Sequence, residues 1–239
     1  KLEGMFDNDG DGTPDTPFEY HVGMNSMLRN IDLTANKAIM GDNMELMINV
    51  DYAQFYKKKH RIGGDVFLSS RDAEKTRIGC TLSDGLGSGV KANVLATMTA
   101  NMAQKLSFSP LQVIKSSEII MDTLPVCKER KISYATFSIA QMNLDTPNIV
   151  KTRLIEYDNP ESFLFFEGTP AHFKRQTIAL KRERGGRREV VKYSEMELCD
   201  GHRLVLMSDG VTQAGIGTRA YPLGWRLEPI REFISHAIQ

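Results

Sequence analysis

The segment at residues 82–89 reads Leu-Ser-Asp-Gly-Leu-Gly-Ser-Gly, and it decides how the chain is interpreted. An apolar run precedes its aspartate, so the sequence predicts a strand that ends at Asp84. After Gly89, apolar residues recur at the spacing of an α-helix. A carboxylate at a strand end is held rigidly, and a neighbouring glycine lets another group approach closely. The segment therefore predicts a site between a strand and a helix.

Two other segments share this design, an apolar run that ends in an aspartate beside glycine. Residues 62–65 read Ile-Gly-Gly-Asp, and residues 205–210 read Val-Leu-Met-Ser-Asp-Gly. Taken singly, each pair of aspartate and glycine is typical of an ordinary turn. Three such carboxylates brought together would suit Mg²⁺ or Mn²⁺, which prefer oxygen ligands. We expect Asp65, Asp84 and Asp209 to converge on metal ions.

Around these segments the pattern alternates between strands and helices. Strands are expected at residues 45–58, 64–70, 77–83, 132–142, 150–157, 162–167 and 202–207, with two more on either side of a basic turn at 181–188. Helices are expected at residues 24–41, 90–106, 109–124 and 225–238. The turn at residues 158–161 is expected to pair the strands on either side of it. This order predicts an α+β sandwich of antiparallel sheets.

Composition excludes several classes of protein. The chain has 239 residues, and its 30 basic residues balance 30 acidic ones, so no overall charge directs it to nucleic acid or to an anionic membrane. The three cysteines are far apart, which indicates neither a disulfide framework nor a zinc site and favours a cytoplasmic setting. No apolar stretch approaches the length of a membrane-spanning helix, so no membrane segment is expected.

Residues 1–20 differ in texture from the rest, and we treat them as a leader separate from a domain at residues 21–239. The run at 7–15 places Asp7, Asp9, Asp11 and Asp15 at the spacing of a calcium loop. Phe18 occupies the position where an EF-hand needs a glutamate. The alternatives are a short calcium-binding segment, typical of an extracellular protein, or an acidic leader derived from a tag.

The basic turn at residues 181–188 also has two interpretations. Its lysine and arginine side chains would suit phosphate or nucleic acid. A solvated hairpin turning at Gly185-Gly186 is favoured, because no aromatic residues interleave with the basic ones. No nucleic-acid partner is expected.

The three aspartate segments together, in this order and spacing, resemble the SpoIIE-like serine/threonine phosphatases of the PPM (type 2C-like) family over residues 45–239. The resemblance implies a PPM-type α-β-β-α sandwich, two antiparallel sheets flanked by helices. It also implies hydrolysis of phosphoserine or phosphothreonine by a metal-activated water, with no side-chain nucleophile. By resemblance, Asp84 would bridge two Mn²⁺ or Mg²⁺ ions, the Gly85 carbonyl would complete one of them, and Asp65 and Asp209 would supply further ligands.

The resemblance also implies a bacterial signalling role, a phosphorylated protein substrate such as a STAS-fold anti-sigma-factor antagonist, and leaves a homodimer open. Two features depart from the family. The family's Asp-Asp-x-Thr segment near the end of the domain is absent from this sequence, so we expect the domain to lack its C-terminal strand. Gln213 stands where many relatives have glutamate. The alternative hypothesis is a catalytically weak PPM-fold module with a regulatory or scaffold role.

The helix expected after Gly89 has its own hypothesis. In SpoIIE-like enzymes the corresponding helices resemble a switch that positions the metal-site aspartates. Val94, Met98 and Met102 would belong to such a switch, since the helix begins shortly after Gly85. The alternative, that these three side chains are simply part of the core, is left open.

Overall fold

The fold was obtained as a computed structural model of the whole chain. It describes residues 2–6, 16–20, 27–36, 45–55, 62–74, 76–87, 89–109, 113–123, 135–184 and 187–238. The acidic run at 7–15, with the predicted calcium ligands, lies outside the described residues. Within the described part, no helix is long and apolar enough to cross a membrane.

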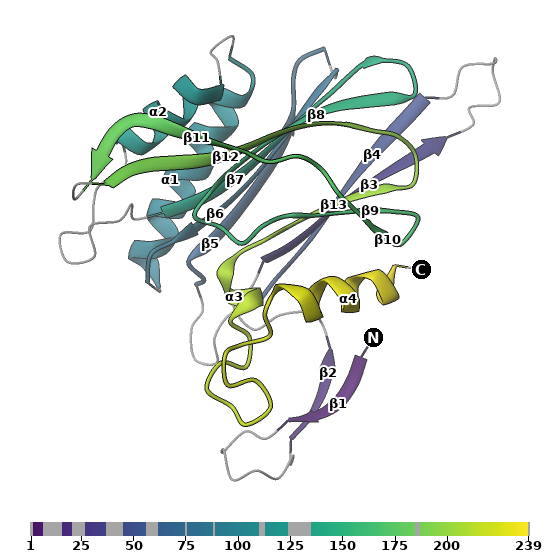
Figure 1. Cartoon of the computed structure of the whole chain (residues 1–239), viewed down its shortest axis with the longest axis vertical. Coiled ribbons are helices and arrows are strands. Elements are labelled where there is room, and N and C mark those ends of the chain that lie inside the picture. The colour runs from purple at the N-terminus through teal and green to yellow at the C-terminus, as the bar shows by residue number, and fades with distance from the viewer. Residues whose placement is uncertain are drawn as a thin grey trace.

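Two antiparallel sheets dominate the structure (Figure 1). The larger sheet has six strands, in the spatial order β11 (Gln176–Arg184), β12 (Arg187–Leu198), β8 (Ile149–Tyr157), β7 (Ala135–Thr146), β6 (Arg77–Gly85) and β5 (Asp65–Arg71). The smaller has five, in the order β10 (Thr169–Ala171), β9 (Phe163–Phe166), β13 (His202–Met207), β3 (Met27–Asn36) and β4 (Glu45–Gln54). Two further strands, β1 (Leu2–Phe6) and β2 (Thr16–Tyr20), form a separate hairpin.

Side chains alternate between the two faces of each sheet along every strand, and both faces are packed. On β6, the buried side chains of Cys80 and Leu82 point towards the smaller sheet and join the core between the sheets. On β7, Phe137 and Ile139 point the other way and pack under the helices. A fully buried side chain of this size contributes about 1.5–3 kcal/mol by leaving water, so both faces add substantially to stability.

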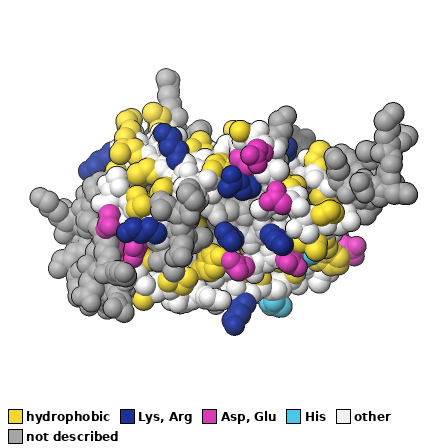
Figure 2. All heavy atoms as spheres, turned by 90° about the horizontal axis from the view of Figure 1, so that it is seen from above, with side chains coloured by type: hydrophobic (Ala, Val, Ile, Leu, Met, Phe, Trp, Pro, Cys, Tyr) yellow, Lys and Arg dark blue, Asp and Glu magenta, His cyan; other side chains and the backbone are white. Residues whose placement is uncertain are grey.

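Among the described residues, four helices accompany the sheets: α1 (Val90–Ser107), α2 (Val113–Thr123), the short α3 (Asp209–Thr212) and α4 (Leu227–Ala237). The first two cover the outer face of the larger sheet, and α4 covers the outer face of the smaller one (Figure 1). This arrangement is the α-β-β-α sandwich, so the predicted fold class is confirmed. On the face seen from above, the basic and acidic side chains of the described residues intermingle (Figure 2).

The small side chains on one face of α1 let the helix approach the larger sheet closely. Ala92, Ala96 and Ala100 are fully or almost fully buried there. Further along, the amide of Gln104 donates to Ser70 Oγ at 2.6 Å and to the Gly79 carbonyl at 2.7 Å. Because a buried amide left without these partners would cost about 1–3 kcal/mol, the hydrogen bonds fix α1 against β5 and β6.

Two expectations about the elements are wrong. Residues 24–41 were expected to be helical, but Met27–Asn36 is strand β3, which pairs with β13 on one side and with β4 on the other. Ladders on both edges satisfy its backbone groups and override its local helical preference. The strands β8 and β9 were expected to pair, but they belong to different sheets, because residues 158–162 carry the chain across from one to the other.

Candidate active site

The first two aspartates of the predicted site lie side by side. Asp65 opens β5 and Asp84 lies next to the end of β6, and the two residues are directly paired in the antiparallel ladder. Directly paired residues point to the same face of a sheet, with their Cβ atoms about 4.5–5.5 Å apart. The face is the one that carries Leu82, so both carboxylates point into the space between the sheets.

The third aspartate comes from the opposite sheet. Asp209 follows β13 and is the first residue of α3. Its neighbour Ser208 is fully buried and donates from Oγ to Oδ2 of Asp65 at 2.7 Å, which ties the two sheets together at this point. The carboxyl group of Asp84 shares hydrogen bonds with those of Asp65 and Asp209. The structure therefore brings all three predicted carboxylates together at one end of the core between the sheets.

The electrostatics of this cluster are unfavourable without a cation. Burial first, and then the charge of Asp65, raises the pKa of Asp84 to about 10. Burial also raises the pKa of Asp65, although its hydrogen bonds with Asp84 and from Ser208 oppose the rise. The ionised forms of Asp65 and Asp84 are therefore disfavoured unless nearby positive charge compensates them.

The donor set fits a hard divalent ion. It consists of carboxylate oxygens and a nearby backbone carbonyl, with no sulfur or imidazole donor among the residues that meet here. Within the described ranges, no three acidic, histidine or cysteine side chains are already arranged as a complete metal-ligand set. These residues fit Mg²⁺ or Mn²⁺ because their donor atoms are oxygens. Such an ion would also remove the repulsion between the neighbouring carboxylates.

Gly85 needs to be glycine because α1 lies directly against it. A Cβ atom at this position would lie 2.0 Å from the carbonyl oxygen of Ala92. On its other side, the Gly85 amide donates to the Gly64 carbonyl at 3.1 Å. From α1, the side-chain amide of Asn93 donates to the Gly63 carbonyl at 3.0 Å. The glycines of the segments at residues 62–65 and 82–89 therefore let two strand ends and a helix meet around Asp84.

One comparison identifies the family. The sequence pattern of the family described as Stage II sporulation protein E (SpoIIE) matches residues 74–234, which is more than half of the chain and includes Asp84 and Asp209. The chain belongs to the SpoIIE family. No curated protein matches the sequence.

One solved structure supports the fold, and two others are reported beside it. The PP2C phosphatase domain of the cell fate determinant SpoIIE from Bacillus subtilis, with a fragment of its regulatory domain, matches at a TM-score of 0.54 and 15% identity over 87% of this chain. The RsbU and RsbW domains of a Mycobacterium tuberculosis protein match at 0.49 and 13% over 91%, and RsbX in complex with magnesium at 0.48 and 18% over 86%. The chain covers 64% of the SpoIIE structure, 55% of the RsbU–RsbW structure and 91% of RsbX.

Several residues around the SpoIIE-family site could not be assigned from sequence. Gln213 donates from Nε2 to Oδ2 of Asp209 at 2.9 Å, so the residue that departs from many relatives orients a predicted ligand. Gln54 donates to the Asp65 carbonyl at 2.8 Å from β4. Asp158, interpreted only as a turn residue, lies close enough for the charge of Asp209, after burial, to raise its pKa. The Asp-Asn-Pro sequence at 158–160 signals a turn but not what it lies beside.

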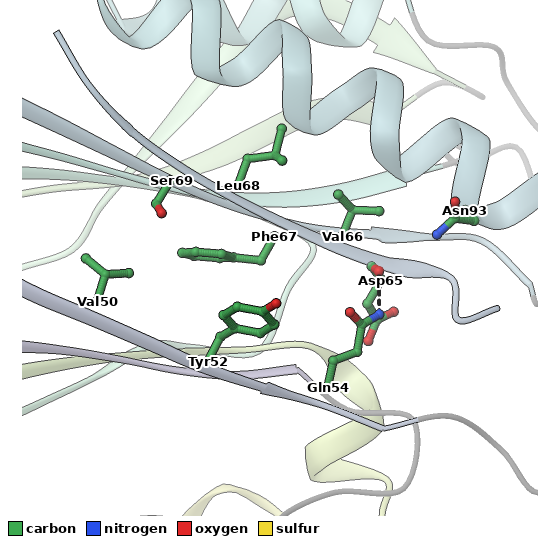
Figure 3. A pocket seen from close by; sticks show the side chains of 9 residues that line it. All are labelled: Val50, Tyr52, Gln54, Asp65, Val66, Phe67, Leu68, Ser69 and Asn93. Carbon is green, nitrogen blue, oxygen red and sulfur yellow. Dashed lines mark hydrogen bonds between the residues drawn. The ribbon is translucent and has the colours of Figure 1, made fainter. Parts of the chain in front are cut away.

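A groove of about 420 Å³ adjoins the site between β4 and β5 (Figure 3). Tyr52 and Phe67 stack within it, with ring centroids 6.1 Å apart. Gln54 and Asp65 lie together at one end of the groove, joined by their hydrogen bond (Figure 3). The groove therefore opens next to a predicted metal ligand.

The three residues of the predicted switch are placed differently. Val94 and Met98 are 49% and 47% exposed, so the alternative that they belong to the core is wrong. Met102 packs against the cluster that contains Ala103 and Ile120, so for this residue the core interpretation is confirmed. Nothing in this arrangement tests the switch itself.

The turn at residues 181–188 is a hairpin between β11 and β12, as expected, with Arg184 paired to Arg187. Neither Cys80 nor Cys199 forms a disulfide with another described residue.

The raised pKa of Asp84 predicts how stability depends on pH without metal. The folded-state pKa of about 10 lies above the unfolded value, so stability is highest at low pH and falls as pH rises towards 10. In chelator, we expect wild type to lose about 1–4 kcal/mol between pH 5 and pH 8, at up to about 1.4 kcal/mol per pH unit. Asp84→Asn should lose much less, as measured by urea unfolding.

The exposed Asp145 at the far end of β7 offers a matched control. Asp145→Asn should follow wild type at both pH values. Parallel pH dependence of wild type and Asp84→Asn would contradict the account of the buried carboxylates.

Proposed function

We propose that this SpoIIE-family chain is a metal-dependent protein phosphatase that hydrolyses phosphoserine or phosphothreonine. The observation that carries the proposal is the meeting of Asp65, Asp84 and Asp209 from two sheets, at a cost in burial and repulsion that a bound cation would relieve. Membership of the SpoIIE family and the similarity of the fold to a PP2C phosphatase domain support the reaction type.

The proposed cofactors are two Mn²⁺ or Mg²⁺ ions. Asp84 lies between the other two aspartates and would contact both ions, Asp65 and the Gly85 carbonyl would complete one, and Asp209 would hold the other. When bound, such ions neutralise phosphoryl oxygens and acidify a water for in-line attack on phosphorus.

The neighbouring residues prepare the ligands for this role. Ser208 donates to Oδ2 of Asp65, which would orient this carboxylate for metal binding. Gln213 does the same for Asp209. The missing Cβ of Gly85 keeps the helix close to the backbone that would supply the carbonyl. No side-chain nucleophile is required by this arrangement.

The proposed substrate is a phosphorylated protein of the STAS fold in bacterial signalling, acted on in the cytoplasm. Support comes from the SpoIIE family match. The groove beside Asp65 gives such a substrate an accessible surface next to the site. We also propose that residues 21–239 act as the phosphatase domain and residues 1–20 as a separate leader.

The direct test compares manganese-dependent hydrolysis of p-nitrophenyl phosphate and of a phosphoserine peptide by wild type and Asp84→Asn. Metal ions stabilise phosphoryl-transfer transition states by several kcal/mol, so kcat should fall at least about 100-fold in the variant. Asp145→Asn should retain wild-type activity. Equal activity of wild type and Asp84→Asn would refute the proposal, and a wild type that binds metal but hydrolyses neither compound would favour the weak regulatory module.

The hydrogen bond from Gln213 predicts a graded effect. Gln213→Leu removes the donor that orients Asp209 but keeps the metal ligand itself, and loss of such supporting contacts typically weakens metal affinity about 10–100-fold. The Mn²⁺ concentration for half-maximal activity should rise accordingly, with little change in kcat at saturation. An unchanged half-saturating concentration would mean that Gln213 has no role in positioning Asp209.

We further propose that α1 and α2 act as a switch through Gly85. A shift of α1 would displace Gly85, because Ala92 of the helix lies against it. Met102→Ala loosens the packing between α1 and the cluster below it, and should change the half-saturating Mn²⁺ concentration. Val191→Ala, in the same cluster but on β12, is the control for lost stability. Equal metal dependence in both variants would argue against a switch.

A further inference from the structure

The loop at residues 213–226 connects α3 to α4 and begins at the candidate site. Gln213, its first residue, donates a hydrogen bond to Asp209. At its other end, the Arg226 amide donates to the Thr212 carbonyl at 3.0 Å, so the two ends of the loop lie together. The loop extends beyond α3, which begins at Asp209 (Figure 1). Compact surface loops with adjacent ends frequently carry function.

Two residues anchor the returning end of the loop. Gly224 lies so close to α3 that a Cβ atom there would be 2.5 Å from the carbonyl oxygen of Thr212. The next residue, Trp225, packs against Phe233 of α4, with ring centroids 5.3 Å apart. The base of the loop is therefore fixed to both helices.

Hydrogen bonds within the loop give its outer part a defined shape. The Thr218 hydroxyl donates to the Gly215 carbonyl at 2.7 Å and accepts from the Tyr221 amide at 3.1 Å. The Gly217 amide donates to the Pro222 carbonyl at 3.4 Å. The outgoing and returning halves of the loop therefore lie side by side.

Three large apolar side chains of this loop face solvent. Ile216 is 58% exposed, Tyr221 46% and Leu223 69%. Ile216 and Leu223 flank the contact between the two halves of the loop, and the Tyr221 ring lies over Gly215. Single exposed apolar side chains are common, but a group of them held in place beside a site indicates contact with another molecule.

The charge of the loop is entirely positive. Arg219 and Arg226 are its only charged residues, and both are exposed. Arginine suits phosphate and carboxylate groups, and arginine and tyrosine are both enriched at protein interfaces. Because phosphoserine carries a charge of about −1.5 to −2 at neutral pH, the loop complements a phosphorylated, acidic protein surface.

The position of the loop favours the substrate over other occupants. Asp209, one helical turn from the base of the loop, is itself exposed. A membrane or a second copy of the chain on the loop would lie over this edge of the site and obstruct a phosphorylated protein. A substrate on the loop would instead have its phosphorylated residue near Asp209.

We propose that the loop at residues 213–226 docks the phosphorylated protein substrate, by binding an apolar and acidic surface beside the phosphorylated residue. The inference rests on the proposed function and deepens it, because it names the feature of the substrate that is recognised. Ile216, Tyr221 and Leu223 contact apolar side chains of the substrate, and the two arginines attract its negative charge.

Two synthetic phosphoserine peptides test this docking role in the full chain with Mn²⁺. One peptide has leucine and glutamate residues around the phosphoserine, and the other has glycine and serine residues. For wild type, kcat/KM should be at least about tenfold higher for the first peptide, chiefly through a lower KM, because a few buried apolar contacts dominate such interfaces. The double variant Ile216→Ser, Leu223→Ser should lose most of this preference.

Three comparisons separate docking from chemistry and from folding. The double variant should hydrolyse p-nitrophenyl phosphate within about twofold of wild type, since exposed substitutions away from the metal ligands change little. Met47→Ser removes an exposed apolar side chain near the opposite end of β4 from Gln54, and should keep the wild-type preference. Arg219→Gln should raise KM for the acidic peptide and weaken its dependence on salt.

Each other outcome overturns a stated part of the account. If wild type hydrolyses both peptides equally well, or if the double variant keeps the preference, the docking role is overturned while the proposed function stands. The docking role is also overturned if the double variant loses only a dimer in sedimentation, or only binding to vesicles of anionic phospholipid. If wild type hydrolyses neither peptide nor p-nitrophenyl phosphate, the proposed function fails, and the docking role fails with it.

Discussion

Repulsion among three neighbouring carboxylates is the constraint on which the rest of this structure depends. Asp65 and Asp84 are direct cross-strand neighbours, and Asp209 reaches them from the other sheet. Left to themselves, charged groups in a buried space would separate or stay protonated, and the pKa of about 10 for Asp84 expresses that tendency. The fold has to supply enough packing and hydrogen bonding to keep them together.

The sandwich supplies this packing and hydrogen bonding in three ways. The core between the sheets, which includes Leu82 and Leu206, holds both strand ends in fixed relation. The hydrogen bond from Ser208 to Asp65 connects the sheets at the site itself. On the outer side, α1 presses against Gly85 and limits movement of the strand that carries Asp84. The site thus sits where three independently packed layers meet, which is why its geometry is sensitive to all of them.

Much of this could be predicted from the sequence because its signals are local. The aspartates stand beside glycines at the ends of apolar runs, and the helical period after Gly89 is regular over more than four turns. The remaining features depend on contacts between distant segments. Met27–Asn36 becomes a strand only because β13 and β4 flank it, and nothing within residues 150–167 shows that β8 and β9 belong to different sheets.

The same distinction applies to the supporting residues. Gln213 is four positions from Asp209, so a helical turn could have indicated their contact, but Asp158 lies near Asp209 only because residues 158–162 cross from one sheet to the other. The central claim is that these carboxylates exist to share divalent cations. Anomalous diffraction at the manganese edge, from crystals grown with Mn²⁺, tests it most directly. The account predicts two peaks at about 2–2.3 Å from carboxylate oxygens, both touching Asp84 and one touching Asp209. Crystals without manganese at these aspartates would contradict it.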